Sequence, residues 1–245
     1  MNPELILALQ LILAHVITDF VMQSQKMITQ KREKKARAPF LYFHAFLAGL
    51  LTYLIVQDWR MWLIPIIISV THFFIDLWKL NKKNDSLKYF LLDQFFHLIV
   101  LLLVWLYLTS NFSEVLPFIT YIFNSTVTLV VLVGYLIVIF PVGFIIGKAT
   151  RRWQEEIAGD EGKFPSLQKA GRYIGIFERI LVLTFILTDN FAAIGLLIAA
   201  KSILRFSDKG KSGARKQTEY VLIGTLMSFS LTIIIGLLMR VLVLQ

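Results

Sequence analysis

The chain has 245 residues, 57% of them hydrophobic, with a net charge of +9 and no cysteine. Globular domains contain about 45–50% apolar residues, so this composition favours a membrane as the solvent of the fold. The positive charge makes nucleic-acid binding an alternative. The positions of the basic residues along the chain, described below, decide between the two interpretations. The lack of cysteine excludes disulfides and thiolate metal ligands.

Eight hydrophobic segments predict an all-α, polytopic bundle of transmembrane helices, because roughly 20 apolar residues cross a hydrocarbon layer of about 30 Å. They are residues 3–23, 39–56, 61–79, 87–109, 127–148, 172–188, 191–206 and 218–240. The short pair 172–188 and 191–206 forms either a tight hairpin or a re-entrant pair, which would leave seven spans. No basic stretch precedes the first segment, so we expect a retained helix rather than a signal peptide. Segment 113–126 is predicted to be interfacial, with Pro117 outside any helix.

Basic residues gather after the first, third, fifth and seventh spans, in segments 26–37, 79–88, 148–172 and 209–216. The positive-inside rule then places these segments in the cytoplasm and both termini on the extracytoplasmic side. Topology accounts for the net charge, so we expect contact with membrane lipid, including anionic headgroups, and no nucleic-acid partner. We expect a single membrane domain, 1–245, made of a four-helix half (1–110) and C-terminal helices (127–245).

The histidines carry the strongest signal for function. Three of the four have an aspartate four residues away, with the order reversed in the fourth span. The pairs are His15–Asp19, His72–Asp76 and Asp93–His97, and His44 stands alone. Residues four apart share one face of a helix, and ionisable groups inside a membrane are costly enough to mark function by default.

The predicted topology places these pairs in one polar layer. All four histidines lie about 11–12 residues from the extracytoplasmic end of their spans, which is roughly 17 Å deep. The three aspartates lie one helical turn closer to the cytoplasm. Imidazole and carboxylate are ligands for zinc, manganese or iron, so the seven side chains predict a site for a divalent transition metal. A proton or ion pathway, and polar contacts that only hold the bundle together, are the alternatives.

A second polar cluster lies in the C-terminal half, at Glu178, Arg179, Lys201 and Arg205. If the chain turns between the two short spans, Glu178 and Lys201 are equally far from the turn and form an ion pair, which we interpret as structural. Arg179, Lys201 and Arg205 then leave a surplus of positive charge. That surplus is suited to bind the phosphate or carboxylate group of a substrate.

Several motifs resemble a bacterial membrane family, domain of unknown function 3307: HVITDFVMQ, HFFIDLWK, DQFFHL, GIFERI, IAAKSILRF and EYVLIGTLMS. The His-x-x-x-Asp pairs alone are also similar to those of bacterial membrane-bound metal-dependent hydrolases. We therefore hypothesise a metal-dependent hydrolase of the bacterial inner membrane, with its site open to the cytoplasm and an anionic lipid or phosphate-bearing substrate. Two alternatives stay open: a transporter or channel that uses the same layer, and a non-catalytic membrane partner subunit.

Overall fold

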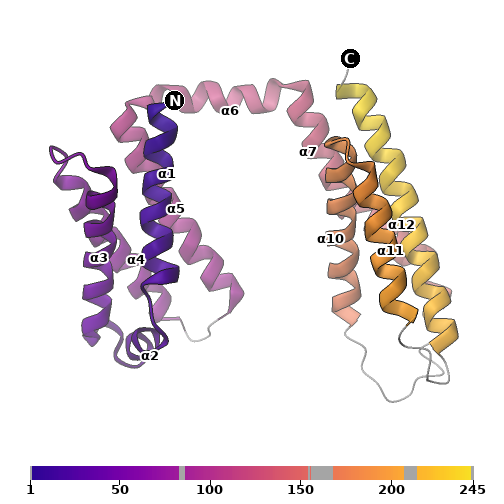
Figure 1. Ribbon diagram of the computed structural model, residues 1–245, viewed down its shortest axis with the longest axis horizontal. Helices are drawn as coiled ribbons and strands as arrows, with labels where there is room; N and C mark the ends of the chain where they lie inside the picture. Colours follow the sequence, from indigo (N-terminus) through magenta and orange to yellow (C-terminus); the bar gives the residue numbers. More distant parts are fainter. Residues whose placement is uncertain (1, 83–85, 154, 156–167, 207–213, 244–245) are drawn as a thin grey trace. The chain divides into compact units, whose positions relative to one another are not determined.

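The computed structural model describes residues 2–82, 86–153, 155, 168–206 and 214–243, except the side chains of 168–170, 204–206 and 214–218. Every regular element within these residues is a helix. The chain divides into two compact units, Met1–Pro117 and Phe118–Gln245, which we call the N-terminal and C-terminal units. Within each unit, the long helices run side by side (Figure 1).

Four long helices form the N-terminal unit, and the short helix α2 lies at one end of them (Figure 1). The elements are α1 (Pro3–Val16), the π-helical turn η1 (Ile17–Val21), α2 (Gln25–Lys34), the 3-10 turn η2 (Lys35–Arg37), α3 (Pro39–Val56), α4 (Leu63–Leu80), α5 (Leu87–Thr109) and the 3-10 turn η3 (Asn111–Glu114). We call the end that carries α2 the basic end, because α2 is rich in lysine and arginine. By the charge rule, this end is the predicted cytoplasmic one.

The C-terminal unit contains α6 (Val115–Asn124), which begins just before the boundary, α7 (Thr126–Ile139), α8 (Pro141–Ala149), α10 (Gln168–Leu187), α11 (Phe191–Phe206) and α12 (Ala214–Val243). The short pair of predicted spans folds as a helical hairpin of α10 and α11. The chain turns between them at Asp189, whose φ of 60° lies in the left-handed region. Aspartate tolerates this conformation better than most residues other than glycine.

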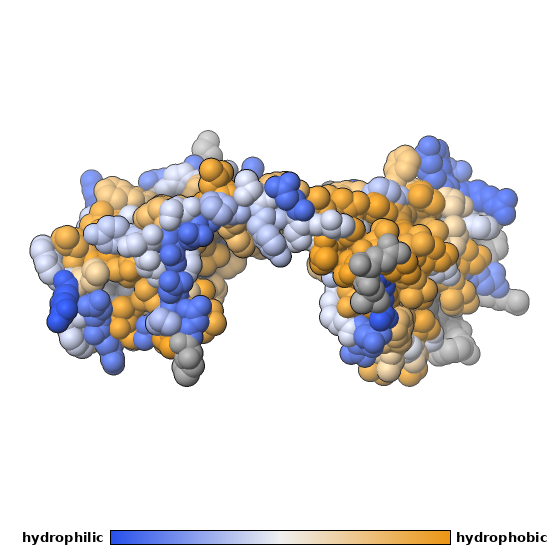
Figure 2. Space-filling view, turned by 90° about the horizontal axis from the view of Figure 1, so that it is seen from above, coloured by the Kyte–Doolittle hydropathy of each residue, from blue (hydrophilic) through white to orange (hydrophobic). Residues whose placement is uncertain are grey.

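Within the described residues, six helical stretches are long and apolar enough to cross a membrane: Pro3–Val21, Pro39–Val56, Leu63–Leu80, Leu87–Thr109, Thr126–Ala149 and Glu219–Val243. The two other predicted spans correspond to α10 and α11. Large apolar side chains lie exposed on the outer sides of both units (Figure 2). A membrane is the solvent that such a surface requires, because a soluble monomer rarely exposes large contiguous apolar patches. The predicted class, an all-α polytopic membrane protein, is therefore confirmed.

Two prolines change the helices in ways that the sequence interpretation missed. Pro117 lies inside α6, so the prediction that it stays outside any helix was wrong. It occupies the first turn, where the missing N–H would have no acceptor in the same helix anyway. The fifth span is broken, since α7 ends at Ile139 and α8 begins at Pro141. Proline lacks the N–H that would continue the hydrogen-bond ladder, and its ring clashes with the preceding turn.

An apolar core positions the four histidines of the N-terminal unit. Leu11, Ala48, Ile68 and Leu101 belong to one buried cluster. Each lies on a different long helix, four residues from that helix's histidine and on the side away from the basic end. Side chains four apart share a helix face, so burial of the core residue also turns the histidine inward.

Candidate metal centre

The four histidine side chains meet inside the N-terminal unit, one from each long helix: His15 of α1, His44 of α3, His72 of α4 and His97 of α5. None is more than 7% exposed. The ring centroid of His72 lies 4.1 Å from that of His97 and 4.8 Å from that of His44. The centroids of His15 and His97 are 5.1 Å apart. The Nε2 atoms of His44 and His72 face each other at 3.0 Å, so one donates to the other or both face a shared cation.

Asp19 reaches the histidines from the π-helical turn Ile17–Val21. Such turns close i→i+5 hydrogen bonds and occur frequently at functional sites. Its Oδ1 lies 3.2 Å from Nε2 of His72 and 3.3 Å from Nε2 of His44. The distance to Nδ1 of His15, its partner in the i, i+4 pair, is 4.0 Å. Asp19 therefore contacts mainly histidines of neighbouring helices, which the spacing along one helix did not predict.

Asp76 and Asp93 both face His97, whose Nε2 lies 3.8 Å from Oδ1 of each. Their Oδ2 atoms accept hydrogen bonds from lysines. Lys31 Nζ donates to Asp76 over 2.6 Å, and Lys79 Nζ donates to Asp93 over 2.7 Å. Lys31 is 4% exposed, because α2 folds against the basic end of the bundle. The sequence interpretation placed Lys31 and Lys79 in the basic segments between spans, so both contacts were missed.

Two glutamines add hydrogen bonds to the layer. Gln94 Nε2 donates to Oδ2 of Asp19 and to Oδ2 of Asp93, each over 3.2 Å. Its Oε1 lies 3.2 Å from Nε2 of His15. Gln23 Nε2 lies 3.0 Å from Nε2 of the α3 histidine. An amide both donates and accepts, so a glutamine inside or beside an apolar span is the sequence signal that points to these positions.

The donor atoms form groups that can hold a metal ion. Three groups have ligand atoms within 4.8 Å of one another: His15/His72/His97, Asp19/His44/His72 and Asp76/Asp93/His97. Asp93 Oδ1 and His97 Nε2 are buried without a hydrogen-bond partner, and Asp19 Oδ1 lies near two imidazole nitrogens without a well-directed hydrogen bond to either. Buried polar atoms are normally satisfied, so these three need a cation, a proton or water. With neutral histidines, three carboxylates face two ammonium groups, and a bound cation offsets the excess negative charge.

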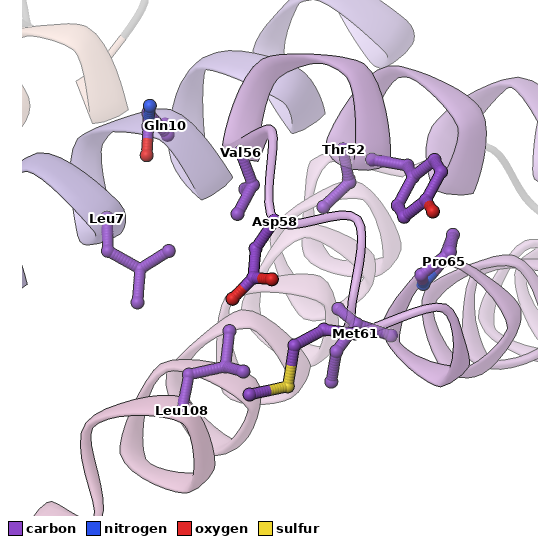
Figure 3. Close-up of a pocket in the computed structure, with 10 residues that line it drawn as sticks. Leu7, Gln10, Thr52, Val56, Asp58, Met61, Pro65 and Leu108 are labelled. Atoms are coloured by element: carbon purple, nitrogen blue, oxygen red, sulfur yellow. The ribbon is translucent and has the colours of Figure 1, made fainter.

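Two voids lie on the side of the histidines away from the basic end. One, of about 10 Å³, has room for about one water and is lined by three of the histidines and Thr52. Thr52 also lines a pocket of about 220 Å³, around which Figure 3 shows Gln10 of α1, Asp58 of the α3–α4 loop and Leu108 of α5. On the other side, the buried Lys31 of α2 covers the layer. The sequence interpretation expected the site to open toward the cytoplasm, which is the predicted side of the basic end. These voids instead lie on the opposite side of the layer.

The second polar cluster lies within the C-terminal unit. Lys201 Nζ donates to Glu178 Oε2 over 2.7 Å, across the hairpin of α10 and α11. Arg179 is 5% exposed and donates to two carbonyl oxygens at the C-terminal end of α7, over 2.5 and 3.2 Å. The last carbonyls of a helix have no donor in the same helix, so Arg179 has a capping role. The side chain of Arg205 lies outside the described residues.

The fold and the site define a polytopic α-helical membrane protein with a buried His/Asp cluster that can hold a metal ion. A family model described as Protein of unknown function (DUF3307) matches residues 6–140. The chain therefore belongs to that family, and the predicted family is confirmed. Of the motifs that indicated it, HVITDFVMQ, HFFIDLWK and DQFFHL lie within the matched range, and the other three lie after it. The matched range contains all seven histidines and aspartates of the layer and ends before Glu178. Neither a curated protein nor a solved structure matches the chain, so the similarity to metal-dependent hydrolases stays a hypothesis.

Proposed function

We propose that this protein binds a divalent transition metal in the His/Asp layer of its N-terminal unit, within a bacterial inner membrane. The supporting observation is the buried convergence of four imidazoles and three carboxylates, some of whose atoms have no hydrogen-bond partner. Two of the three ligand groups, one around Asp19 and the other around Asp76 and Asp93, share no residue. The layer therefore offers ligands for two ions at once.

The reaction that we propose is hydrolysis of an anionic lipid or another phosphate-bearing substrate. A metal bound in this layer would supply a Lewis acid and a water acidified enough to attack at neutral pH. The void beside the histidines has room for about one such water. Lys79 and Gln94 orient Asp93 and Asp19 through hydrogen bonds to their Oδ2 atoms, while Lys31 occupies the Oδ2 of Asp76. The assignment of Arg179 and Lys201 to substrate binding, together with Arg205, stays a prediction from sequence.

Transport of an ion or proton is the second candidate, and the voids favour it. The pocket of about 220 Å³ and the void of about 10 Å³ share Thr52, so they follow one another toward the histidines. Asp58 lies at the pocket, where a carboxylate attracts cations. Lys31 covers the other side of the layer as a positive charge that a cation would have to displace. This arrangement suits a path that is closed at the basic end.

The metal content of the purified full-length chain tests the site. After incubation with zinc, manganese or iron salts and removal of free ions, elemental analysis should find stoichiometric metal. His72→Ala and Asp76→Asn should lose it, because each removes a ligand. Asp189→Asn is the matched control, since Asp189 is an exposed carboxylate of the C-terminal unit, outside the layer. Metal-free wild-type protein that keeps its fold would refute the proposal.

Proteoliposomes separate the two activities. Release of a hydrolysed product by metal-loaded protein, lost in Asp76→Asn, supports the hydrolase. Metal or proton flux without product supports the transporter. If alanine replacements in the layer lower only the stability and spare the biological activity, the chain acts as a non-catalytic partner subunit.

A further inference from the structure

The C-terminal unit contains a large cavity of its own, between α8, α10, α11 and α12, with some lining from the end of α7. Its volume is about 1490 Å³. Pockets for drug-sized molecules measure about 300–1,000 Å³, so this one has room for a larger ligand. The described residues that line it all belong to the C-terminal unit, and none of them is part of the His/Asp layer.

Charge is unbalanced around the described lining of this cavity. Five of its side chains are basic, and only Glu178 is acidic. Lys201 is paired with that glutamate, and Arg151 with a glutamate four residues further along the chain. Lys148 and Arg172 have no acidic partner among the described residues, and both are exposed. The cavity therefore attracts an anion at the end where α8 finishes and α10 begins.

Two buried polar groups of the lining have unused hydrogen-bonding capacity. Arg179 is 5% exposed, and two of its N–H groups donate hydrogen bonds to carbonyl oxygens of α7. A guanidinium carries five N–H donors, so three remain for a ligand. Ser228 Oγ, on α12, is buried and has no hydrogen-bond partner. Phosphate oxygens are suitable acceptors for both groups, because guanidinium–phosphate hydrogen bonds are charge-assisted.

The rest of the lining is largely apolar, with Phe144 of α8, Ile174 of α10, Leu197 of α11 and Val221 of α12 among its residues. A small soluble anion would leave these walls without apolar contacts, whereas an acyl chain would cover them. We propose that the cavity binds an anionic phospholipid, with its phosphate toward the basic side chains and its acyl chains along the apolar walls. Lipid binding here does not require the metal proposed for the N-terminal unit, although Arg179 and Lys201 are also residues predicted from the sequence to bind the anionic group of the substrate.

Lipid binding is tested on the metal-free full-length chain in detergent by native mass spectrometry. The probes are phosphatidylglycerol and phosphatidylcholine with identical acyl chains, and inorganic phosphate as a competitor. We expect the wild type to retain phosphatidylglycerol more tightly than phosphatidylcholine. Arg172→Gln should weaken retention about tenfold, because it removes one charge-assisted contact. Arg152→Gln is the matched control, an exposed arginine that does not line the cavity.

A second pair of variants tests the location rather than the charge. Gly147 lines the cavity and Gly195 does not, and a Cβ added to either meets nothing within 4 Å. Gly147→Leu should fill part of the cavity and lower lipid retention, while Gly195→Leu should leave it unchanged. Equal retention of the two lipids, or equal loss in the two leucine variants, overturns the proposal. Full displacement of the lipid by millimolar phosphate would assign the site to a soluble anion and would also overturn it.

Discussion

Lys31→Met tests whether the ammonium group of Lys31 balances the charge of Asp76 in the position that a metal cation would otherwise take. The Nζ–Oδ2 distance is 2.6 Å, and the two side chains are only 6% and 8% exposed. Water therefore screens this pair little. Removing one partner of a buried ion pair costs about 3–5 kcal/mol, because the other charge is left uncompensated. For a chain of this size, that corresponds to a fall in Tm of about 6–20 °C, at about 2–4 °C per kcal/mol.

Metal should reverse much of this loss. Asp76 belongs to a ligand group with Asp93 and His97, so a divalent cation bound there replaces the missing ammonium charge. Lys31 competes with that cation in the wild type. Its removal should therefore lower the Kd for metal, and a ligand stabilises the fold more as its Kd falls below the ligand concentration. We expect added metal to raise the Tm of Lys31→Met more than that of the wild type.

The assay is thermal unfolding of detergent-purified protein, first with a chelator and then with increasing zinc or manganese. Lys26→Met is the control, because Lys26 lies exposed in the same helix and should change stability by no more than about 0.5 kcal/mol. The reasoning is refuted if metal-free Lys31→Met is as stable as the control. An equal Tm increment from metal in Lys31→Met and wild type would refute the competition between lysine and cation.

Three further substitutions test packing and polar contacts by the same unfolding assay. Arg179→Ala should cost about 2–4 kcal/mol, because two carbonyls of α7 lose a charged donor; a neutral result would contradict the capping role. Gly49→Ala should cost about 1–3 kcal/mol, since its Cβ would meet a carbonyl of α4, whereas Gly195→Ala meets nothing. Lys201→Met leaves Glu178 without its partner, so it should be less stable than the Glu178→Gln/Lys201→Met double variant by about 0.5–3 kcal/mol. If the stability losses of the two single variants simply add up to that of the double variant, the two side chains are not coupled.

Local periodicity predicted the chemistry of the site but not its full membership. His15, His72 and His97 could be assigned to one buried layer because an i, i+4 pair shares a face in any helix. Lys31 could not, because its contact with Asp76 depends on how α2 folds back against the bundle. The apolar Met27, four residues before Lys31, marks the buried face of α2, but this spacing does not say which acidic group the lysine contacts.

The sequence by itself determined the class of the protein, the helical positions and the polar layer, because hydropathy over about 20 residues and helical spacing are local properties. Only the tertiary structure decided which atoms meet. The π-helical turn directs Asp19 to His44 and His72 rather than to its own pair, and the end of α7 engages Arg179 as a cap. These contacts join residues distant in the chain, and the packing of helices selects them among the many pairings that the same spacing allows.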